Sequence, residues 1–126
     1  MKLRIALTAF ALLAAAAPAA LAAGDVEKGK GVFKRCQVCH DPKTNKVGPH
    51  LGGVVGRKAG SLADFHYSDA MKKKGEEGLV WTEENLTSYL KDPKAFVPGN
   101  KMVFVGLKKD DEIADVIVYL KSLTNP

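Results

Sequence analysis

Both cysteines of the chain lie in one short motif, and this motif constrains the fold more than any other feature. Cys36 and Cys39 stand three residues apart in "CQVCH", and His40 follows directly. Three kinds of site use such a motif: a redox-active disulfide, a zinc site and a covalently attached haem. The rest of the chain has to distinguish between them.

The sequence around the motif fits a disulfide or a zinc site poorly. A thioredoxin-like motif belongs to a βαβ unit, whereas here the cysteines end a predicted helix and no parallel sheet is readable. A structural zinc ion takes four protein ligands, and only His50 and His66 remain to complete a set with Cys36, Cys39 and His40. C-x-x-C-H is the attachment motif for haem c. The two thiols can bond to the vinyl groups of one haem, and the histidine then lies beneath the iron.

The first 23 residues have the composition of an export signal. Two basic residues precede an uncharged run over residues 5–23, which ends in small residues. A membrane anchor is the alternative, because nineteen uncharged residues nearly span a bilayer, but the run is mostly alanine and no linker follows it. We therefore expect a secretory signal peptide over residues 1–23, cleaved after Ala22 or Ala23. The remaining residues, 24–126, are expected to form a single domain.

The charge balance argues against nucleic-acid binding. The chain has 19 basic and 14 acidic residues, and two of the basic residues lie in the leader, so the domain carries a net charge near +3. The sequence has no arginine-rich run, and a mildly basic surface of this kind is usually solvated. The alternative is that some of these basic residues form a face that binds an acidic protein partner.

Hydrophobic spacing and capping residues predict short helices separated by long loops, an all-α domain. One helix is capped by Asp25 and runs into the cysteine motif, and a second is capped by Ser68 or Asp69 and stopped by Gly75. A third follows Thr82 and ends before Pro93. A last one is capped by Asp110 or Asp111, with an apolar face at Ile113, Val116, Ile117 and Leu120. Residues 41–67 and 93–109 are predicted as loops. Loops of this length in a small domain indicate a large apolar group at its centre.

Four segments resemble a class I cytochrome c, nearest to the bacterial cytochrome c2 branch. They are "GDVEKGKGVFKRCQVCH", "VGPHLGGVVGRKAGS", "FHYSDAMKKKG" and "PGNKMVFVGLKKDDEIADVIVYLKSL". They occur in the family's order and extend from Gly24 to about Leu123. The resemblance implies an all-α fold of short helices and long loops wrapped around one covalent haem c.

The resemblance also selects the second axial ligand of the iron. The residues alone leave Met71, Met102, His50 and His66 as candidates. Met102 matches the family's axial methionine in "PGNKMVF", so the resemblance implies His40 and Met102 as axial ligands. It implies thioether bonds from Cys36 and Cys39. His50 and His66 are expected to be surface or loop residues. A thioether ligand favours ferrous iron and raises the reduction potential.

Further residues match positions around the haem in the family. The carbonyl of Pro49 is expected to accept a hydrogen bond from the ring of His40, and Tyr89 is expected near the sulfur of Met102. Arg57, Tyr67 and Trp81 match residues that bond to a buried haem propionate. Gly29 and Phe33 with Val116 and Tyr119 resemble the contact between the first and last helices. The segment from Gly75 to Val80 is longer than in the shorter family members.

With both axial positions filled, the expected function is one-electron transfer, and the chain is not expected to be an enzyme. The resemblance implies a monomeric periplasmic carrier without a stable membrane anchor or nucleic-acid partner. It is expected to move electrons from a cytochrome bc complex to a photosynthetic reaction centre or a terminal oxidase. Lysines near the haem edge would contact acidic faces of these partners. These lysines are Lys34, Lys46, Lys94, Lys101, Lys108 and Lys109.

Overall fold

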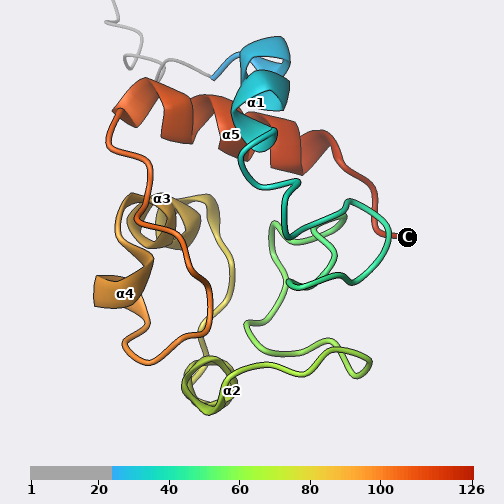
Figure 1. The fold of residues 1–126 in the computed structure, drawn as a ribbon, viewed down its shortest axis with the longest axis vertical. Coiled ribbons are helices and arrows are strands. Elements are labelled where there is room, and N and C mark those ends of the chain that lie inside the picture. Colours follow the sequence, from blue (N-terminus) through green and yellow to red (C-terminus); the bar gives the residue numbers. More distant parts are fainter. Residues whose placement is uncertain (1–23) are drawn as a thin grey trace, which may run out of the picture.

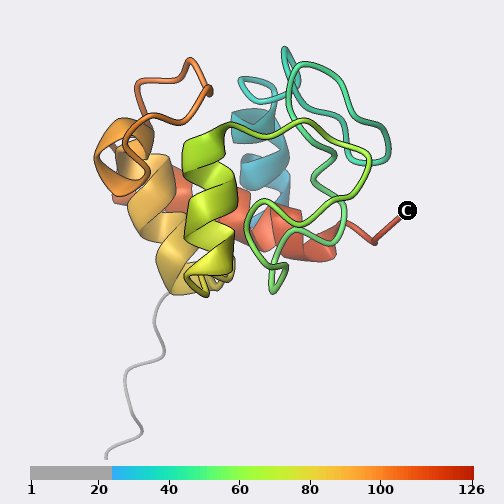
Figure 2. The same cartoon turned by 90° about the horizontal axis from the view of Figure 1, so that it is seen from below.

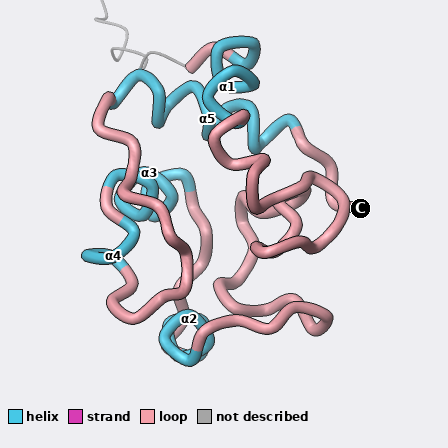
Figure 3. Tube along the Cα trace, in the orientation of Figure 1, coloured by secondary structure: helices cyan, strands magenta, loops and turns pink. Residues whose placement is uncertain are grey.

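A computed structural model describes residues 24–126, and the predicted signal peptide lies outside the described residues. Within these residues, five helices follow one another. They are α1 (Val26–Phe33), α2 (Asp69–Glu76), α3 (Glu83–Lys91), α4 (Pro93–Phe96) and α5 (Asp110–Ser122). Figure 3 shows long loops after α1 and after α4, and within residues 24–126 no strand forms beyond one isolated bridge between Lys58 and Val80. The predicted all-α fold is therefore confirmed.

The first and last helices pack across each other at one end of the molecule (Figure 1). Asp25 caps α1 as predicted, because its carboxylate accepts from the backbone N–H of Lys28. Gly29 faces α5 so closely that an added Cβ would lie 2.8 Å from the Cβ of Tyr119. The ring of Phe33 packs on that of Tyr119, with centroids 5.0 Å apart. The interhelical contact that the resemblance implied is thus present.

Helix α2 begins as predicted but does not end at Gly75. The hydroxyl of Ser68 accepts from the N–H of Met71 at the N-terminus, and the helix continues through Gly75 to Glu76. Gly75 is buried against the carbonyl of Ala59, where any Cβ would clash, so it allows close packing rather than a stop. The turn that ends the helix contains Gly78, with a φ of 100°. The segment whose length was unusual thus consists of the last turn of α2 and this turn.

Helix α3 follows its predicted limits, but the next segment does not. The hydroxyl of Thr82 caps α3, and its C-cap is Asp92, just before Pro93. We expected a continuous loop over residues 93–109, whereas Pro93–Phe96 form the short helix α4. Pro93 fits the first turn of a helix because that position needs no N–H donor, and the carboxylate of Asp92 caps Ala95.

Helix α5 has its predicted apolar face but a different start. Ile113, Val116, Ile117 and Leu120 are all buried. The N-cap is Lys109, which makes no side-chain capping bond, so the prediction of Asp110 or Asp111 as the cap was wrong. Both aspartates lie in the first turn instead, where their charges favour the positive end of the helix dipole.

The loops enclose the middle of the molecule. Figure 2, seen from below, shows α2 in front, with the loops of residues 34–68 on one side and α3, α4 and the 97–109 loop on the other. Trp81 and Tyr89 are buried there, with ring centroids 4.8 Å apart. No helix within residues 24–126 is long and apolar enough to cross a bilayer.

Candidate functional site

The cysteine motif forms a tight turn directly after α1. The N–H of Cys36 bonds to the carbonyl of Phe33 at 2.8 Å, and the N–H of His40 bonds to the carbonyl of Cys36 at 2.8 Å. Both thiols are unbridged and partly exposed. Burial raises the pKa of Cys36 to about 11, which keeps this thiol protonated at neutral pH. The turn thus presents two thiols and one imidazole from five consecutive residues.

The ring of His40 is fixed in one tautomer. Its Nδ1 lies 2.7 Å from the carbonyl oxygen of Pro49. A carbonyl can only accept, so Nδ1 carries the proton and Nε2 keeps a free lone pair. Burial lowers the pKa of His40, which favours the neutral ring. Gly48 lies against this ring, and an added Cβ would stand 2.7 Å from Nε2. A neutral imidazole with a free Nε2 is the form that binds a metal ion.

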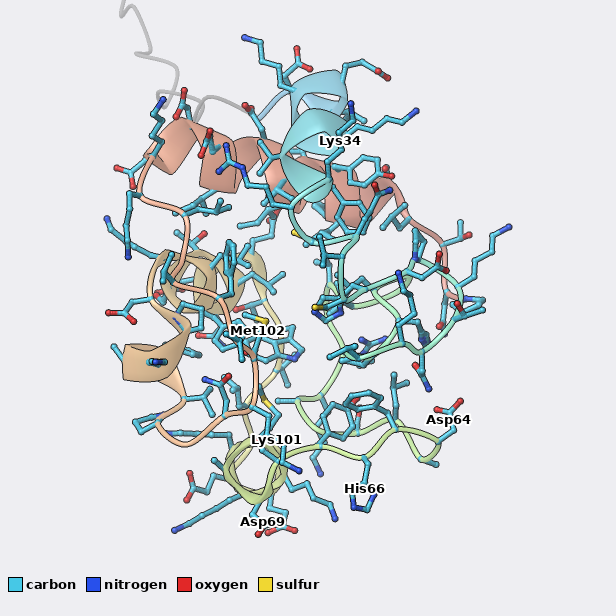
Figure 4. All side chains as sticks on the ribbon, viewed as in Figure 1. Lys34, Asp64, His66, Asp69, Lys101 and Met102 are labelled. Carbon is cyan, nitrogen blue, oxygen red and sulfur yellow. The ribbon has the colours of Figure 1, made fainter. Side chains whose placement is uncertain are left out.

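Met102 lies in the loop between α4 and α5, toward the centre of the molecule (Figure 4). Its backbone N–H donates to Oδ1 of Asn100 at 2.8 Å. The Nδ2 group of Asn100 donates to the carbonyls of Pro93 and Val97 at 3.0 and 2.8 Å. The hydroxyl of Tyr89 lies 3.7 Å from Sδ of Met102 and donates to it. Burial raises the pKa of Tyr89 to about 12, so this hydroxyl stays protonated. Hydrogen bonds therefore hold Met102 both at its backbone N–H and at its sulfur.

Arg57, Tyr67 and Trp81 supply polar groups around the same central region. Arg57 donates to the carbonyl of His50 at 2.8 Å, and burial lowers its pKa. It has no carboxylate partner among residues 24–126, where the ion pairs involve other cations. Burial also raises the pKa of Tyr67, whose hydroxyl accepts from the N–H of Leu62 at 3.3 Å. Trp81 is buried. A partly buried guanidinium without a carboxylate fits an anionic group supplied from outside the chain.

His50 was expected to be a surface or loop residue, and only the second description holds. It lies in a loop as predicted, but it is only 8% exposed, and neither ring nitrogen has a hydrogen-bond partner. Most buried polar atoms in native proteins bond to the protein or to ordered water, so this ring requires a water molecule or another group that residues 24–126 do not supply. His66 is exposed on its loop, as expected. Met71 lies on α2, partly buried against the core.

The donor set fits a haem better than a zinc ion or a redox disulfide. Within residues 24–126, no three His, Cys, Asp or Glu side chains gather to hold a metal ion. The helix precedes Cys36 instead of starting there, so the thioredoxin-like arrangement is absent from the described part as well. A neutral imidazole, a held thioether, two thiols and an unpaired Arg57 match the needs of a covalent haem with its propionates.

All six lysines proposed for partner contact are exposed. None of them forms one of the ion pairs found within residues 24–126. Lys94, Lys101 and Lys108 line one surface hollow of about 350 Å³ together with Met102. Asp92 also lines this hollow, but no carboxylate within residues 24–126 forms an ion pair with these three lysines.

Two asparagines near the site were missed in the sequence. Asn100 holds the backbone of Met102, and Asn45 accepts from the N–H of His50 at 2.9 Å. Both act through side-chain hydrogen bonds to loop backbone, which leave no periodic pattern in the sequence. For Asn100 a signal did exist, because "PGN" just before Met102 is typical of a turn whose last side chain bonds to nearby backbone.

The family described as Cytochrome c matches residues 26–124 of the chain. A cytochrome c2 of Agrobacterium tumefaciens (strain II Chrys) is 51% identical over 100 residues, covering 77% of this chain and 90% of its own. A cytochrome c2 of Rhodomicrobium vannielii is 51% identical over 121 residues, covering 94% and 93%. The solved ferricytochrome c2 from Rhodopseudomonas palustris superposes with a TM-score of 0.75 at 43% identity, covering 79% of this chain and 99% of its own.

The family match spans most of the described fold and includes the whole cysteine motif. The family match and the solved structure agree with the all-α architecture. The chain therefore belongs to the cytochrome c family, as a class I member close to the bacterial cytochromes c2, and it is an electron carrier with one covalently attached haem c rather than an enzyme.

Proposed function

We propose that His40 and Met102 are the axial ligands of the haem iron, and that Cys36 and Cys39 form its thioether bonds. The observation that carries this proposal is the hydrogen bond from Nδ1 of His40 to the carbonyl of Pro49, at 2.7 Å. It leaves Nε2 free for iron and fixes the plane of the ring. The bond from Tyr89 to Sδ of Met102, at 3.7 Å, supports a fixed position for the thioether.

The polar residues of the site would hold the rest of the haem. Arg57, Tyr67 and Trp81 would bond to a buried propionate, directly or through water, which would give the guanidinium of Arg57 its missing anion. A buried propionate beside a cation costs less to keep charged than an isolated one. Pro49 would strengthen His40 as a ligand by accepting its ring proton.

Two protein ligands would leave no open position for a substrate. The bound haem supplies a metal centre that takes up and releases one electron. Asn100 and Tyr89 would keep Met102 in place in both oxidation states, so that little structure would have to rearrange during transfer. Buried side chains such as Trp81 and Leu107 would limit the access of water to the haem.

The lysines named above are proposed to dock the protein on acidic faces of its redox partners. Exposed valines stand beside several of them: Val47 next to Lys46, and Val103 and Val105 between Lys101 and Lys108, with exposures of 79%, 99% and 81%. An apolar centre within a charged rim suits small, transient and salt-sensitive complexes. The proposed donor is a cytochrome bc complex, and the proposed acceptor is a photosynthetic reaction centre or a terminal oxidase.

We propose that this transfer takes place in the periplasm. A signal peptide over residues 1–23 would be removed on export, and residues 24–126 would act as one monomeric domain without a membrane anchor. Covalent haem attachment through two thiols suits that compartment. Mass spectrometry of the exported protein should give the mass of residues 23–126 or 24–126 plus one haem.

A pyridine haemochrome assay on periplasmic material tests the proposal together with ligand binding. Covalent haem survives denaturation and extraction, so the assay should give the spectrum of a haem with two thioether bonds. The unmutated ferric protein should bind cyanide only slowly near neutral pH, because Met102 occupies the iron. Rapid cyanide binding would indicate an open iron and a peroxidase-like activity instead.

A further inference from the structure

The peptide bond between Pro49 and His50 carries two hydrogen bonds at once. Its carbonyl oxygen accepts from Nδ1 of His40 at 2.7 Å. Its N–H, on the opposite edge of the same planar unit, donates to Oδ1 of Asn45 at 2.9 Å. The side chain of Asn45 and the ring of His40 are therefore joined through one rigid amide.

The chain of bonds continues beyond Asn45. Its Nδ2 group donates to the backbone carbonyl of Asp64 at 3.3 Å, in the loop before α2. Because carboxamide and peptide groups are polarisable dipoles, bonds in such a series strengthen one another. An acceptor on the N–H of His50 makes the carbonyl of Pro49 a stronger acceptor for the proton of His40.

We infer that Asn45 is a positioning residue for the proximal ligand, and that it lowers the reduction potential of the haem iron through the Pro49–His50 peptide. When the carbonyl of Pro49 accepts the Nδ1 proton more strongly, the imidazole of His40 gains negative character, and this stabilises ferric iron. The inference rests on the proposed ligation of iron by His40. Asn45 touches neither the ligand nor the iron.

A purely structural role for Asn45 predicts the opposite sign. If Asn45 only tied two loops together, its loss would loosen the site and admit water, which favours the charged ferric state and lowers the potential. Loss of the polarised amide raises the potential instead. The direction of the shift therefore separates the two explanations.

Two variants at this position separate its two hydrogen bonds. Asn45→Leu keeps the side-chain volume and removes both bonds, while Asn45→Asp keeps the acceptor for the N–H of His50 and loses the donor to Asp64. Asn85→Leu is the matched control, because its amide also donates to one backbone carbonyl, that of Val80 at 2.8 Å, in α3 outside the histidine loop.

The test is a redox titration of each holoprotein, with the proton resonance of His40 Nδ1–H in the ferrous state as a second measurement. For Asn45→Leu we expect the ratio of ferrous to ferric protein at a fixed solution potential to rise roughly threefold. This corresponds to a reduction potential higher by about 28 mV, at 59 mV per tenfold change in the ratio. Its ring-proton resonance should move to lower frequency. Asn45→Asp should leave the potential unchanged or lower it, and the control should shift it by less than a third as much.

Each outcome decides the inference. A fall in the potential of Asn45→Leu, equal shifts in the Leu and Asp variants, or an unmoved His40 proton would overturn it. The methionine-to-ferric-iron absorption band is recorded for every variant. If that band is missing from the unmutated protein, the proposed ligand set fails. If it is present everywhere and the potentials do not move, only the role of Asn45 fails.

Discussion

Asn100 is the residue whose loss should most selectively free Met102, the proposed axial ligand. Its side chain makes three hydrogen bonds: it accepts from the N–H of Met102 at 2.8 Å and donates to Pro93 and Val97 at 3.0 and 2.8 Å. Each such bond contributes about 1 kcal/mol net. Because Asn100 is partly exposed, water would replace some of this, and Asn100→Ala should destabilise the closed loop by about 2 kcal/mol.

A loss of about 2 kcal/mol corresponds to roughly a thirtyfold change in the opening equilibrium of the loop. With the proposed ligation, cyanide would reach ferric iron only when Met102 had left it. The rate of cyanide binding to ferric Asn100→Ala should therefore rise about thirtyfold over the unmutated protein. Asn100→Asp keeps the acceptor for Met102 and loses both donors, so its rate should lie between the two.

Stopped-flow absorption at the haem band measures these rates directly, and urea unfolding of the same proteins reports their overall stability. Asn85→Ala is the control, since it removes an amide that bonds to Val80 and lies outside the methionine loop. The reasoning is refuted if Asn100→Ala binds cyanide at the unmutated rate. It is also refuted if Asn85→Ala accelerates binding to the same extent.

Three other perturbations test the fold, the docking face and the pH dependence. Gly29→Ala gains helix propensity of about 1 kcal/mol but clashes with α5, so urea unfolding should show a net loss of about 1–3 kcal/mol; unchanged stability would contradict the close approach. The double variant Lys101→Glu/Lys108→Glu should slow electron transfer to an acidic partner at low salt, and its rate should converge with that of the unmutated protein at high salt. The control Lys28→Glu/Lys30→Glu, which makes the same charge change on α1, should not slow the transfer. Equal slowing by both double variants would argue against a defined docking face. Burial raises the pKa of Tyr67, so the stability that its neutral form contributes is complete below the ordinary pKa of about 10 and is lost as pH rises above it. The free energy of unfolding of Tyr67→Phe should therefore fall less steeply with pH in this range than that of the unmutated protein. Identical curves would count against burial of the hydroxyl.

Local signals in the sequence predicted the starts of three helices. Asp25, Ser68 and Thr82 cap α1, α2 and α3 through bonds to residues three positions away, so neighbours in the sequence contain the information. Gly75 was wrongly predicted to end α2, because its role depends on a tertiary contact. It reads as a helix stop, yet it is needed because the carbonyl of Ala59 approaches α2 there.

The site was predictable in a similar, uneven way. Cys36, Cys39 and His40 are adjacent in the chain, and their spacing alone indicates haem chemistry. The acceptor for His40 lies nine residues away in a loop without periodicity, so Pro49 came only from the family resemblance. The burial of His50 depends on how loops fold over one another, which no local pattern encodes.

The central proposal is that Met102, and not Met71, is the axial ligand of the haem iron opposite His40. Both thioethers are partly buried and pack against the core, so burial does not distinguish them. The most direct measurement is the absorption band between methionine sulfur and ferric iron, recorded for the unmutated protein, Met102→Ala and Met71→Ala. The band should be present in the unmutated protein and in Met71→Ala and absent from Met102→Ala. A band that survives in Met102→Ala, or disappears in Met71→Ala, would contradict the proposed ligand set.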